Sequence, residues 1–377
     1  MSSSQSSGSA SPCPPPEPRH VTDLAPVRLG IVGCGGISHR HAPAAAASPE
    51  VEIVACCDPR RDVAEDWAAT YGCGHVFGDY RSMLEEQELD GVLIATWPVL
   101  HCEQILGCLE RGARFVLCEK SLTTGGAEAL DVFRAAGAVS ATVVEALMYR
   151  HHPAVQRVVQ LVESGAAGAV DSVRAYFSLF DEEEPAGDDP LRDWRQQVAR
   201  GGGVPYDLAC YCVDACNLLA GAVPRRTLAV GAHSARYGTI NRLYGLIEYA
   251  GSPVGIVTSS SRSDFDHELR ISGAAGHVTL PVAWRIEAPV DVTFSRSVGW
   301  GRFEEERITI ELVDPYLLQL EHFGAVIRGE REPVPTLAES VVAALTLEAL
   351  VRSATEGTSV DVDMPADVLA ALPRAAT

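Results

Sequence analysis

Between Val27 and Glu145, short apolar runs alternate with segments that have the character of helices. The runs predict buried strands, because a strand covered on both faces is continuously hydrophobic. Strands that alternate with helices predict a parallel, doubly wound sheet with right-handed crossovers. The predicted strands are Val27–Gly33, Val51–Cys57, Gly91–Thr96, Arg114–Cys118 and Ser140–Glu145, and the helices include Asp62–Tyr71, His101–Gly112 and Thr123–Gly137.

Past Tyr149 the pattern is mostly that of strands, and few helices separate the last six of them. This predicts a largely antiparallel sheet with one face free for packing or for another subunit. The predicted strands are Val170–Leu179, Arg226–His233, Arg242–Tyr249, Val254–Ser260, His267–Ser272, His277–Leu280 and Arg307–Leu312, and the helices are Pro153–Ser164, Pro315–Gly329 and Thr336–Gly357.

The length of 377 residues fits two domains. Residues 1–26 are rich in Ser and Pro and predict a disordered tail. Residues 27–148 predict an α/β domain. Residues 149–377 predict an α+β domain for substrate binding and oligomerisation, with an open, largely antiparallel sheet and C-terminal helices.

Composition excludes several kinds of partner. Fifty acidic residues against 30 basic ones give a formal net charge of -20, which opposes binding to phosphate backbones and anionic lipid surfaces. No apolar run reaches the roughly 18 residues that a membrane span requires, and the first residues lack the basic and apolar regions of a secretory signal. We therefore expect a cytoplasmic protein that binds neither nucleic acid nor membrane.

The eleven cysteines predict buried, reduced thiols. None forms a Cys-x-x-Cys pair. Cys210, Cys212 and Cys216 come nearest to a metal pattern, but they lack a fourth ligand at zinc spacing. We expect no metal site.

A glycine-rich turn follows the first predicted strand. The sequence Gly33-Cys34-Gly35-Gly36-Ile37-Ser38 allows main-chain N–H groups to approach a pyrophosphate at a helix N-terminus. Asp58 follows the second strand, where a carboxylate accepts hydrogen bonds from the adenosine ribose hydroxyls. Together they predict a dinucleotide site and make residues 27–148 the dinucleotide-binding domain. The Asp58 carboxylate repels a 2′-phosphate and favours NAD, whereas Arg60 and Arg61 leave NADP as the alternative.

Lys120 is the single lysine of the chain, and every other basic residue is arginine. It follows the strand Arg114–Cys118, at the carboxyl edge where open α/β sheets bind their ligands. Hydride transfer to or from an alcohol needs a side chain that releases and regains a proton. Arginine stays protonated, whereas the pKa of lysine falls readily when it is buried or lies near other cations. Lys120 is therefore a candidate catalytic residue.

Several dispersed motifs resemble the Gfo/Idh/MocA family of sugar and cyclitol oxidoreductases, from Val27 to about Val362. They are Gly30–Ile37 with His41, Ile94-Ala95-Thr96 with Leu100-His101, Glu119-Lys120, Glu145–Pro153, Asp193-Trp194-Arg195, Gly201–Gly203, and Asp207 with Tyr211. The resemblance implies a Rossmann domain followed by an open-sheet domain. Ser121 stands where the family usually has proline, and Trp97-Pro98 replaces the common Pro-Asn.

The resemblance implies that Lys120, Asp207 and Tyr211 are catalytic and lie near the nicotinamide. Either Tyr211 exchanges the proton, with its pKa lowered by the nearby ammonium, or Lys120 does so and Tyr211 orients the substrate. Asp207 holds a substrate hydroxyl or the lysine, or is simply a carboxylate at a helix start. The expected substrate-binding residues are Lys120, Arg150, Asp207 and Tyr211, and the expected cofactor-binding residues are Gly33, Gly35, Gly36, Ile37, Asp58, Arg60, Thr96, Trp97, His101, Glu119, Lys120, Trp194 and Arg195. For His41 and His101, the simpler interpretation is a structural role next to the strands that flank the cofactor.

We expect an NAD(P)-dependent oxidoreductase that transfers a hydride between the nicotinamide and a ring hydroxyl or ketone of a sugar, aminosugar or aminoglycoside-type substrate, within antibiotic biosynthesis. The acidic residues Asp181–Glu184, Asp188 and Asp189 would attract a cationic aminosugar, or would form a solvated loop. The alternatives are an NADPH-dependent reductase of a nucleotide-linked ketosugar, a redox-inactive cofactor-binding sensor and an NAD-dependent glycosidase. The free sheet face predicts a homo-oligomer, either a dimer or a tetramer.

Overall fold

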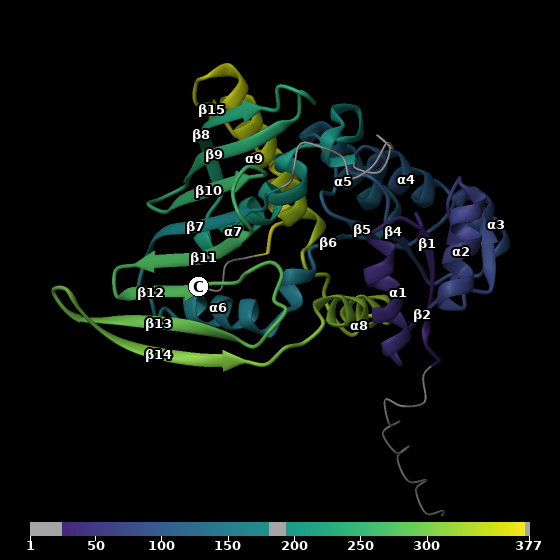
Figure 1. The fold of residues 1–377 in the computed structure, drawn as a ribbon, viewed down its shortest axis with the longest axis horizontal. Helices are drawn as coiled ribbons and strands as arrows, with labels where there is room; N and C mark the ends of the chain where they lie inside the picture. Colours follow the sequence, from purple (N-terminus) through teal and green to yellow (C-terminus); the bar gives the residue numbers. More distant parts are fainter. Residues whose placement is uncertain (1–24, 181–193, 374–377) are drawn as a thin grey trace, which may run out of the picture.

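The computed structural model describes residues 25–180 and 194–373 and contains two sheets (Figure 1). The first sheet has the order β3-β2-β1-β4-β5-β6, and all neighbouring pairs are parallel. The predicted doubly wound parallel sheet is thus confirmed. Its strands are β1 (Val27–Val32), β2 (Val51–Cys57), β3 (His75–Phe77), β4 (Gly91–Ile94), β5 (Phe115–Glu119) and β6 (Thr142–Ala146), connected by α1 (Ser38–Ala47), α2 (Arg61–Tyr71), α3 (Tyr80–Glu86), α4 (Pro98–Glu110) and α5 (Gly126–Val139).

The strand order determines where a site can form. Because β4 lies between β1 and β5, the loops that follow these three strands meet at one edge of the sheet. Those loops carry Gly33, Thr96 and Lys120. Gly33 has φ 98°, and a Cβ at this position would lie 2.7 Å from the main-chain oxygen of Ala95. Glycine is therefore required for the loop after β1 to pass so close to the end of β4.

The second sheet has the order β14-β13-β12-β11-β7-β10-β9-β8-β15. β7 and β10 are parallel, and the other neighbours are antiparallel. Helices α6 (Pro153–Glu163), α7 (Cys210–Ala220) and α9 (Leu337–Glu356) pack on one face (Figure 1). The strands are β7 (Val170–Ser178), β8 (Pro224–His233), β9 (Ile240–Tyr249), β10 (Val254–Ser260), β11 (Asp266–Gly273), β12 (Gly276–Leu280), β13 (Val290–Gly299), β14 (Arg302–Ile310) and β15 (Val360–Asp361).

The C-terminal helices connect the two sheets. α8 (Pro315–Ile327) packs on α1, and α9 packs on α5, α7 and β8. A capping box begins α9, in which the N–H of Glu339 donates to Thr336 Oγ1 and the N–H of Thr336 donates to Glu339 Oε2. The short helix α10 (Ala366–Ala371) follows β15. Within residues 25–180 and 194–373, no helix is both long and apolar enough to cross a membrane.

Several elements differ from the sequence-based prediction. β3, β15 and α3 are too short to give a periodic signal. The predicted strands do not include β13 (Val290–Gly299), although its buried positions Val290, Val292 and Phe294 alternate. The predicted strand Arg307–Leu312 is the second half of β14, which begins at Arg302. The first half of β14 is exposed on both faces at the sheet edge, so its sequence has no apolar alternation.

Candidate functional site

The glycine loop between β1 and α1 has the features of a pyrophosphate site. A Cβ at Gly35 or Gly36 would meet no atom within 4 Å, so a ligand can reach the main chain there. The residue before α1, Ile37, makes no capping hydrogen bond with its side chain. The first turn of α1 is therefore left for an anionic group to cap. The loop fits a nicotinamide dinucleotide, which when bound gives or takes the hydride.

Asp58, directly after β2, is fixed beside this loop. Its Oδ2 accepts a hydrogen bond from the N–H of Cys34 at 3.1 Å, and its Oδ1 accepts one from the N–H of Arg60 at 2.9 Å. The guanidinium Nε of Arg60 lies 3.4 Å from the same Oδ1, and the Arg60 side chain is 63% exposed. A buried carboxylate and an exposed guanidinium thus share the place predicted for the adenosine ribose.

The residues after β4 lie against the glycine loop. A Cβ on Gly33 would approach the side-chain methyl of Thr96 to 2.8 Å, so the two loops are in direct contact. Trp97 is partly buried, and the guanidinium carbon of Arg200 lies 3.8 Å from the centre of its indole ring. This stacking holds the segment before α7 against the loop that follows β4.

His101 connects the loops after β4 and β5. One ring nitrogen lies 2.8 Å from the main-chain oxygen of Ser121, and the other lies 3.2 Å from that of Thr96. The side chain is completely buried, and this burial lowers the pKa of His101. With both nitrogens directed at the main chain, His101 joins the two loops as its structural interpretation predicts, and its cofactor contact stays a prediction.

Glu119, the last residue of β5, joins α1 to the loop that carries Lys120. Its Oε1 lies 2.7 Å from Nε2 of His41, and its Oε2 accepts a hydrogen bond from the N–H of Lys120 at 3.2 Å. Both the glutamate and the histidine are buried. Glu119 therefore orients the lysine from the main-chain side.

The Lys120 side chain points at Asp207. Its Nζ donates hydrogen bonds to the main-chain oxygen of Asp207 at 2.7 Å and to Oδ1 at 2.9 Å. The second carboxylate oxygen accepts a hydrogen bond from Nε of Arg195 at 2.8 Å. The Lys120 and Asp207 side chains are 12% and 8% exposed, whereas that of Arg195 is 45% exposed. Three residues that the sequence singled out thus form one charged cluster.

The cluster keeps its charges at neutral pH. Burial alone would lower the pKa of Lys120, but the carboxylate of Asp207 outweighs burial and raises that pKa above its ordinary value. Burial would likewise raise the pKa of Asp207, but Arg195 and Lys120 hold it well below its usual range. The tendency of burial and neighbouring cations to lower a lysine pKa is thus outweighed at Lys120 by the carboxylate of Asp207.

Tyr211 follows Asp207 across a π-helical turn, Pro205–Ala209, instead of a regular α-helical one. The Lys120 Nζ lies 5.2 Å from the centre of the Tyr211 ring. Within the described residues, the Tyr211 hydroxyl makes one contact, with Sδ of Met148 at 3.7 Å. Burial raises the pKa of Tyr211 well above its ordinary value, so the expectation that the ammonium lowers it is wrong.

Arg150 is not directed at the cluster. Its Nε and Nη2 donate to the two carboxylate oxygens of Asp214 at 2.8 and 2.5 Å, and its Nη1 donates to Glu339 at 2.8 Å. The side chain is buried, and the hydroxyl of Tyr149 also contacts Asp214. The guanidinium of Arg150 therefore ties the segment after β6 to α7 and α9, and its substrate contact stays a prediction.

Glu145 in β6 is a buried carboxyl to which the sequence assigned no role. Its Oε1 accepts a hydrogen bond from the N–H of Leu122 at 2.8 Å, so it holds the loop that carries Lys120. Burial and the nearby Asp214 raise the pKa of Glu145 to about 7. The sequence feature that could have pointed to Glu145 is its position near the end of the strand beside β5.

Trp194 lies in a 3₁₀ turn, Trp194–Gln196, and the guanidinium carbon of Arg195 lies 5.2 Å from the centre of its ring. Arg195 also donates to Asp207, so this turn lies beside the charged cluster, and the cofactor contacts expected of Trp194 and Arg195 stay predictions. The acidic residues Asp181–Glu184, Asp188 and Asp189 lie outside the described residues.

Comparisons with known proteins agree with this arrangement. The profile of an oxidoreductase family with an NAD-binding Rossmann fold, GFO/IDH/MocA, matches residues 27–147, and the profile of the C-terminal domain of that family matches residues 155–279. A D-xylose 1-dehydrogenase (NADP(+)) from Haloferax volcanii is 30% identical over 337 residues, which cover 89% of this chain and 99% of that protein.

A dTDP-3,4-didehydro-2,6-dideoxy-α-D-glucose 3-reductase from Actinomadura kijaniata is 34% identical over 198 residues, 52% of this chain and 57% of that protein. Among solved structures, levoglucosan dehydrogenase in complex with NADH and L-sorbose superposes with a TM-score of 0.80 at 22% identity. That alignment covers 91% of this chain and 100% of the other. It shows a shared fold.

Proposed function

The chain belongs to the Gfo/Idh/MocA family of oxidoreductases, and on this premise we propose that it transfers a hydride between a nicotinamide dinucleotide and a ring hydroxyl or ketone of a sugar. The observation that carries the proposal is the ion pair of Lys120 and Asp207, which lies at the sheet edge that also presents the glycine loop. A protonated, oriented ammonium at that edge suits a substrate oxygen whose charge changes during hydride transfer.

The proposed roles follow from the side chains. Lys120 binds the oxygen of the reacting carbon through one of its N–H groups, while Asp207 keeps it charged. Tyr211 has a hydroxyl with one weak sulfur contact in the described part of the chain, so it is able to donate to or accept from the same oxygen. Either Lys120 or Tyr211 is able to exchange the proton with the substrate oxygen. The variant Tyr211→Phe distinguishes between them.

For the cofactor we propose NAD, with NADP as the second choice. The buried Asp58 carboxylate beside the glycine loop favours the free 2′-hydroxyl of NAD. The exposed Arg60 guanidinium next to it would lessen the repulsion of a 2′-phosphate. The xylose dehydrogenase relative is named for NADP(+), and the structural relative was solved with NADH.

For the substrate we propose a sugar or aminosugar, and a role in antibiotic assembly. A net charge of -20 favours the approach of a cationic substrate. The second candidate is the reduction of a nucleotide-linked ketosugar, which the Actinomadura kijaniata relative favours by its named reaction. The cytoplasm, where nicotinamide cofactors are available, is the setting that we propose.

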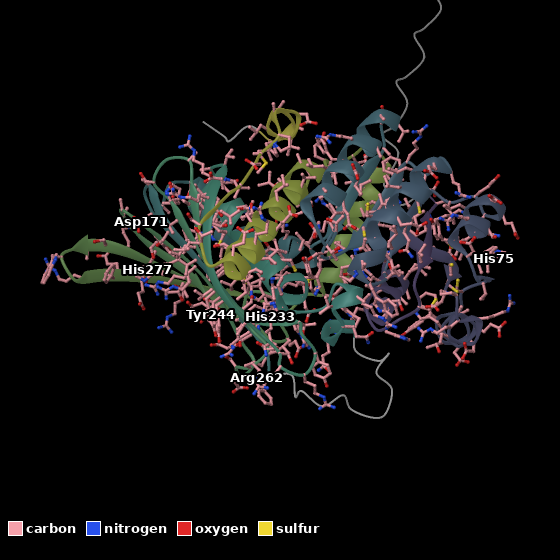
Figure 2. All side chains as sticks on the ribbon, turned by 90° about the horizontal axis from the view of Figure 1, so that it is seen from above. His75, Asp171, His233, Tyr244, Arg262 and His277 are labelled. Atoms are coloured by element: carbon pink, nitrogen blue, oxygen red, sulfur yellow. The ribbon has the colours of Figure 1, made fainter. Side chains whose placement is uncertain are left out.

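A second copy of the chain is the proposed partner. Leu228, Val230, Tyr244 and Leu246 are between 40% and 67% exposed on β8 and β9, and they pair across the two strands. Figure 2 shows Tyr244 on the side of the sheet away from α9. Burying this apolar patch in a dimer would remove it from water. Light scattering on the purified protein gives the oligomeric state. A monomer at micromolar concentration would contradict the proposed dimer.

One assay tests the proposed reaction. The protein is incubated with NAD or NADP and a panel of sugars, aminosugars and glycosides, and the reduced cofactor is followed by absorbance beside product mass. The reverse assay uses NADH or NADPH with ketosugars, free and nucleotide-linked. Net cofactor turnover with a free sugar or aminosugar supports the proposal. Turnover confined to nucleotide-linked ketosugars supports the second candidate, and no net turnover with any substrate contradicts both.

A further inference from the structure

A polar hollow adjoins the charged cluster on the side of Asp207. It lies between the π turn Pro205–Ala209, the loop from β8 to β9 and the ends of β7 and β10, and encloses about 450 Å³, part of it open to solvent. Polar and apolar side chains both line it, and the polar or charged ones include Arg195, Asp207, Ser234, Thr239, Asn241 and Ser261. We call this hollow the Asn241 pocket.

Asn241 is a buried amide with an unsatisfied oxygen. It lies near the start of β9 on the face that the helices cover, and is 8% exposed. Its Oδ1 has no hydrogen-bond partner among the described residues. The main chain of Asn241 is fixed, because its carbonyl oxygen accepts a hydrogen bond from the N–H of Ser261 at 2.9 Å. A buried acceptor without a partner lowers stability, so a ligand with a donor would be favoured there.

Two glycines bring the Asn241 pocket and the charged cluster together. A Cβ on Gly203, which has φ 112°, would lie 2.9 Å from the main-chain oxygen of Ile240. A Cβ on Gly202 would lie 2.5 Å from the main-chain oxygens of Trp194 and Arg195. Only residues without a side chain allow these three segments to pass so closely. The pocket is therefore built onto the same turn that positions Asp207.

Asp207 and Arg195 belong to both regions. Oδ1 of Asp207 accepts from Lys120, and Oδ2 accepts from Arg195, which lines the pocket. Arg195 and Asp207 are the charged residues among the described residues that line the pocket, and their opposite charges cancel in an ion pair. A diphosphate would need cationic donors that are not already paired with a carboxylate. Among the other lining residues, Ser234, Thr239, Asn241 and Ser261 carry hydroxyl or amide groups that match a ring with several hydroxyl or amino groups.

We propose that the Asn241 pocket is a second substrate subsite, which binds a further hydroxylated or aminated ring attached to the ring that reacts beside Lys120. Asn241 Oδ1 accepts a hydrogen bond from a hydroxyl or ammonium group of that second ring. This inference rests on the proposed function, because it assumes that a sugar reacts at Lys120. It narrows the substrate class to glycosides of two or more rings.

The test compares one-ring and two-ring substrates that share the reacting ring: D-glucose against maltose, cellobiose and trehalose, each with NAD and NADP. The wild-type enzyme is expected to have kcat/KM at least about tenfold higher for one of the two-ring sugars. Asn241→Leu removes the acceptor at similar volume, and should lower that kcat/KM by about tenfold or more, mainly through KM, with D-glucose changed less than about twofold.

Two further variants separate binding from folding. Asn241→Asp keeps an acceptor and should retain kcat/KM for the two-ring sugar within about threefold, which a purely structural role would not require. Arg242→Gln alters the next residue of β9, on the exposed face, and should leave both substrates unchanged. Melting temperatures confirm that each variant is folded.

The possible results are distinct. A wild type that oxidises D-glucose without preferring any two-ring sugar overturns the subsite and leaves the proposed function intact. Equal losses on both kinds of substrate in Asn241→Leu, or no loss on either, also overturn the subsite. A wild type that shows no net cofactor turnover with these sugars or with the wider panel of sugars, aminosugars, glycosides and ketosugars overturns the proposed function itself.

Discussion

Lys120 donates hydrogen bonds to both the main-chain oxygen and Oδ1 of Asp207, at 2.7 and 2.9 Å. The double contact orients the ammonium, and the carboxylate keeps it protonated although the side chain is largely buried. Arg195 occupies the other oxygen of the same carboxylate and stabilises its negative charge. The geometry therefore fixes both the position and the protonation state of the single lysine.

Asp207→Asn should shift the pH profile. Without the carboxylate, burial and Arg195 both lower the pKa of Lys120, so the lysine loses its proton at lower pH. For ketone reduction, the alkaline limb of kcat/KM should move to lower pH, and kcat/KM at pH 8 should fall at least about tenfold. An unchanged alkaline limb in stopped-flow or steady-state rates would show that Asp207 does not control the lysine.

Tyr211→Phe should distinguish the catalytic role of the hydroxyl from the packing of the ring. The ring lies within 6 Å of Tyr149, Phe177 and Trp284 and keeps these contacts as phenylalanine. The lost hydroxyl has one weak contact, so the free energy of unfolding should change by less than about 1 kcal/mol. If Tyr211 exchanges the proton, kcat should fall about 10²-fold. A loss below about threefold would assign the proton transfer to Lys120.

Glu145→Gln should remove a pH-dependent loss of stability. The pKa of Glu145 is raised from 4.5 to about 7 in the folded protein. Its contribution to the free energy of unfolding is therefore fully present below pH 4.5 and is lost as pH rises through about 7. The full shift corresponds to about 3 kcal/mol. Glutamine keeps an acceptor for the N–H of Leu122, so the variant should exceed the wild type by up to that amount at pH 8. Urea unfolding at pH 5 and pH 8 measures this, and equal pH dependence in both proteins would refute it.

Asp58→Asn should alter the choice of cofactor. The wild type is expected to have a lower KM for NAD than for NADP, because the carboxylate repels a 2′-phosphate. The amide keeps an acceptor for the N–H of Cys34 but removes the charge, and Arg60 remains nearby. The ratio of the two Michaelis constants should therefore shift by about tenfold or more toward NADP. A wild type that already prefers NADP would contradict the assignment of NAD.

The parts of the structure that depend on local pattern could be predicted from the sequence. The apolar runs, the glycine turn and Asp58 stand at spacings set by one βαβ unit, and the fold around them follows from strand order. Lys120 could be placed because the end of a parallel strand has a known position in such a sheet. The loops that carry Thr96 and Gly33 are placed at the same edge of the sheet by the same rule.

The parts that depend on packing between remote segments could not be predicted. Arg150 is neutralised by Asp214 and Glu339, which come from α7 and α9. The pKa of Tyr211 depends on how completely its ring is covered, which periodicity does not report. Asn241 carried no motif, and its significance comes from burial without a hydrogen-bond partner among the described residues.

Lys120→Arg tests the central claim most directly. Arginine keeps the positive charge and is able to pair with Asp207, but it does not release a proton at neutral pH. The measurement is the turnover of a sugar that the wild type oxidises, beside the dissociation constant of the reduced cofactor from fluorescence titration. We predict an unchanged dissociation constant and a loss of kcat of at least about 10²-fold. A variant that binds cofactor and keeps wild-type kcat would contradict the claim that Lys120 is a catalytic residue.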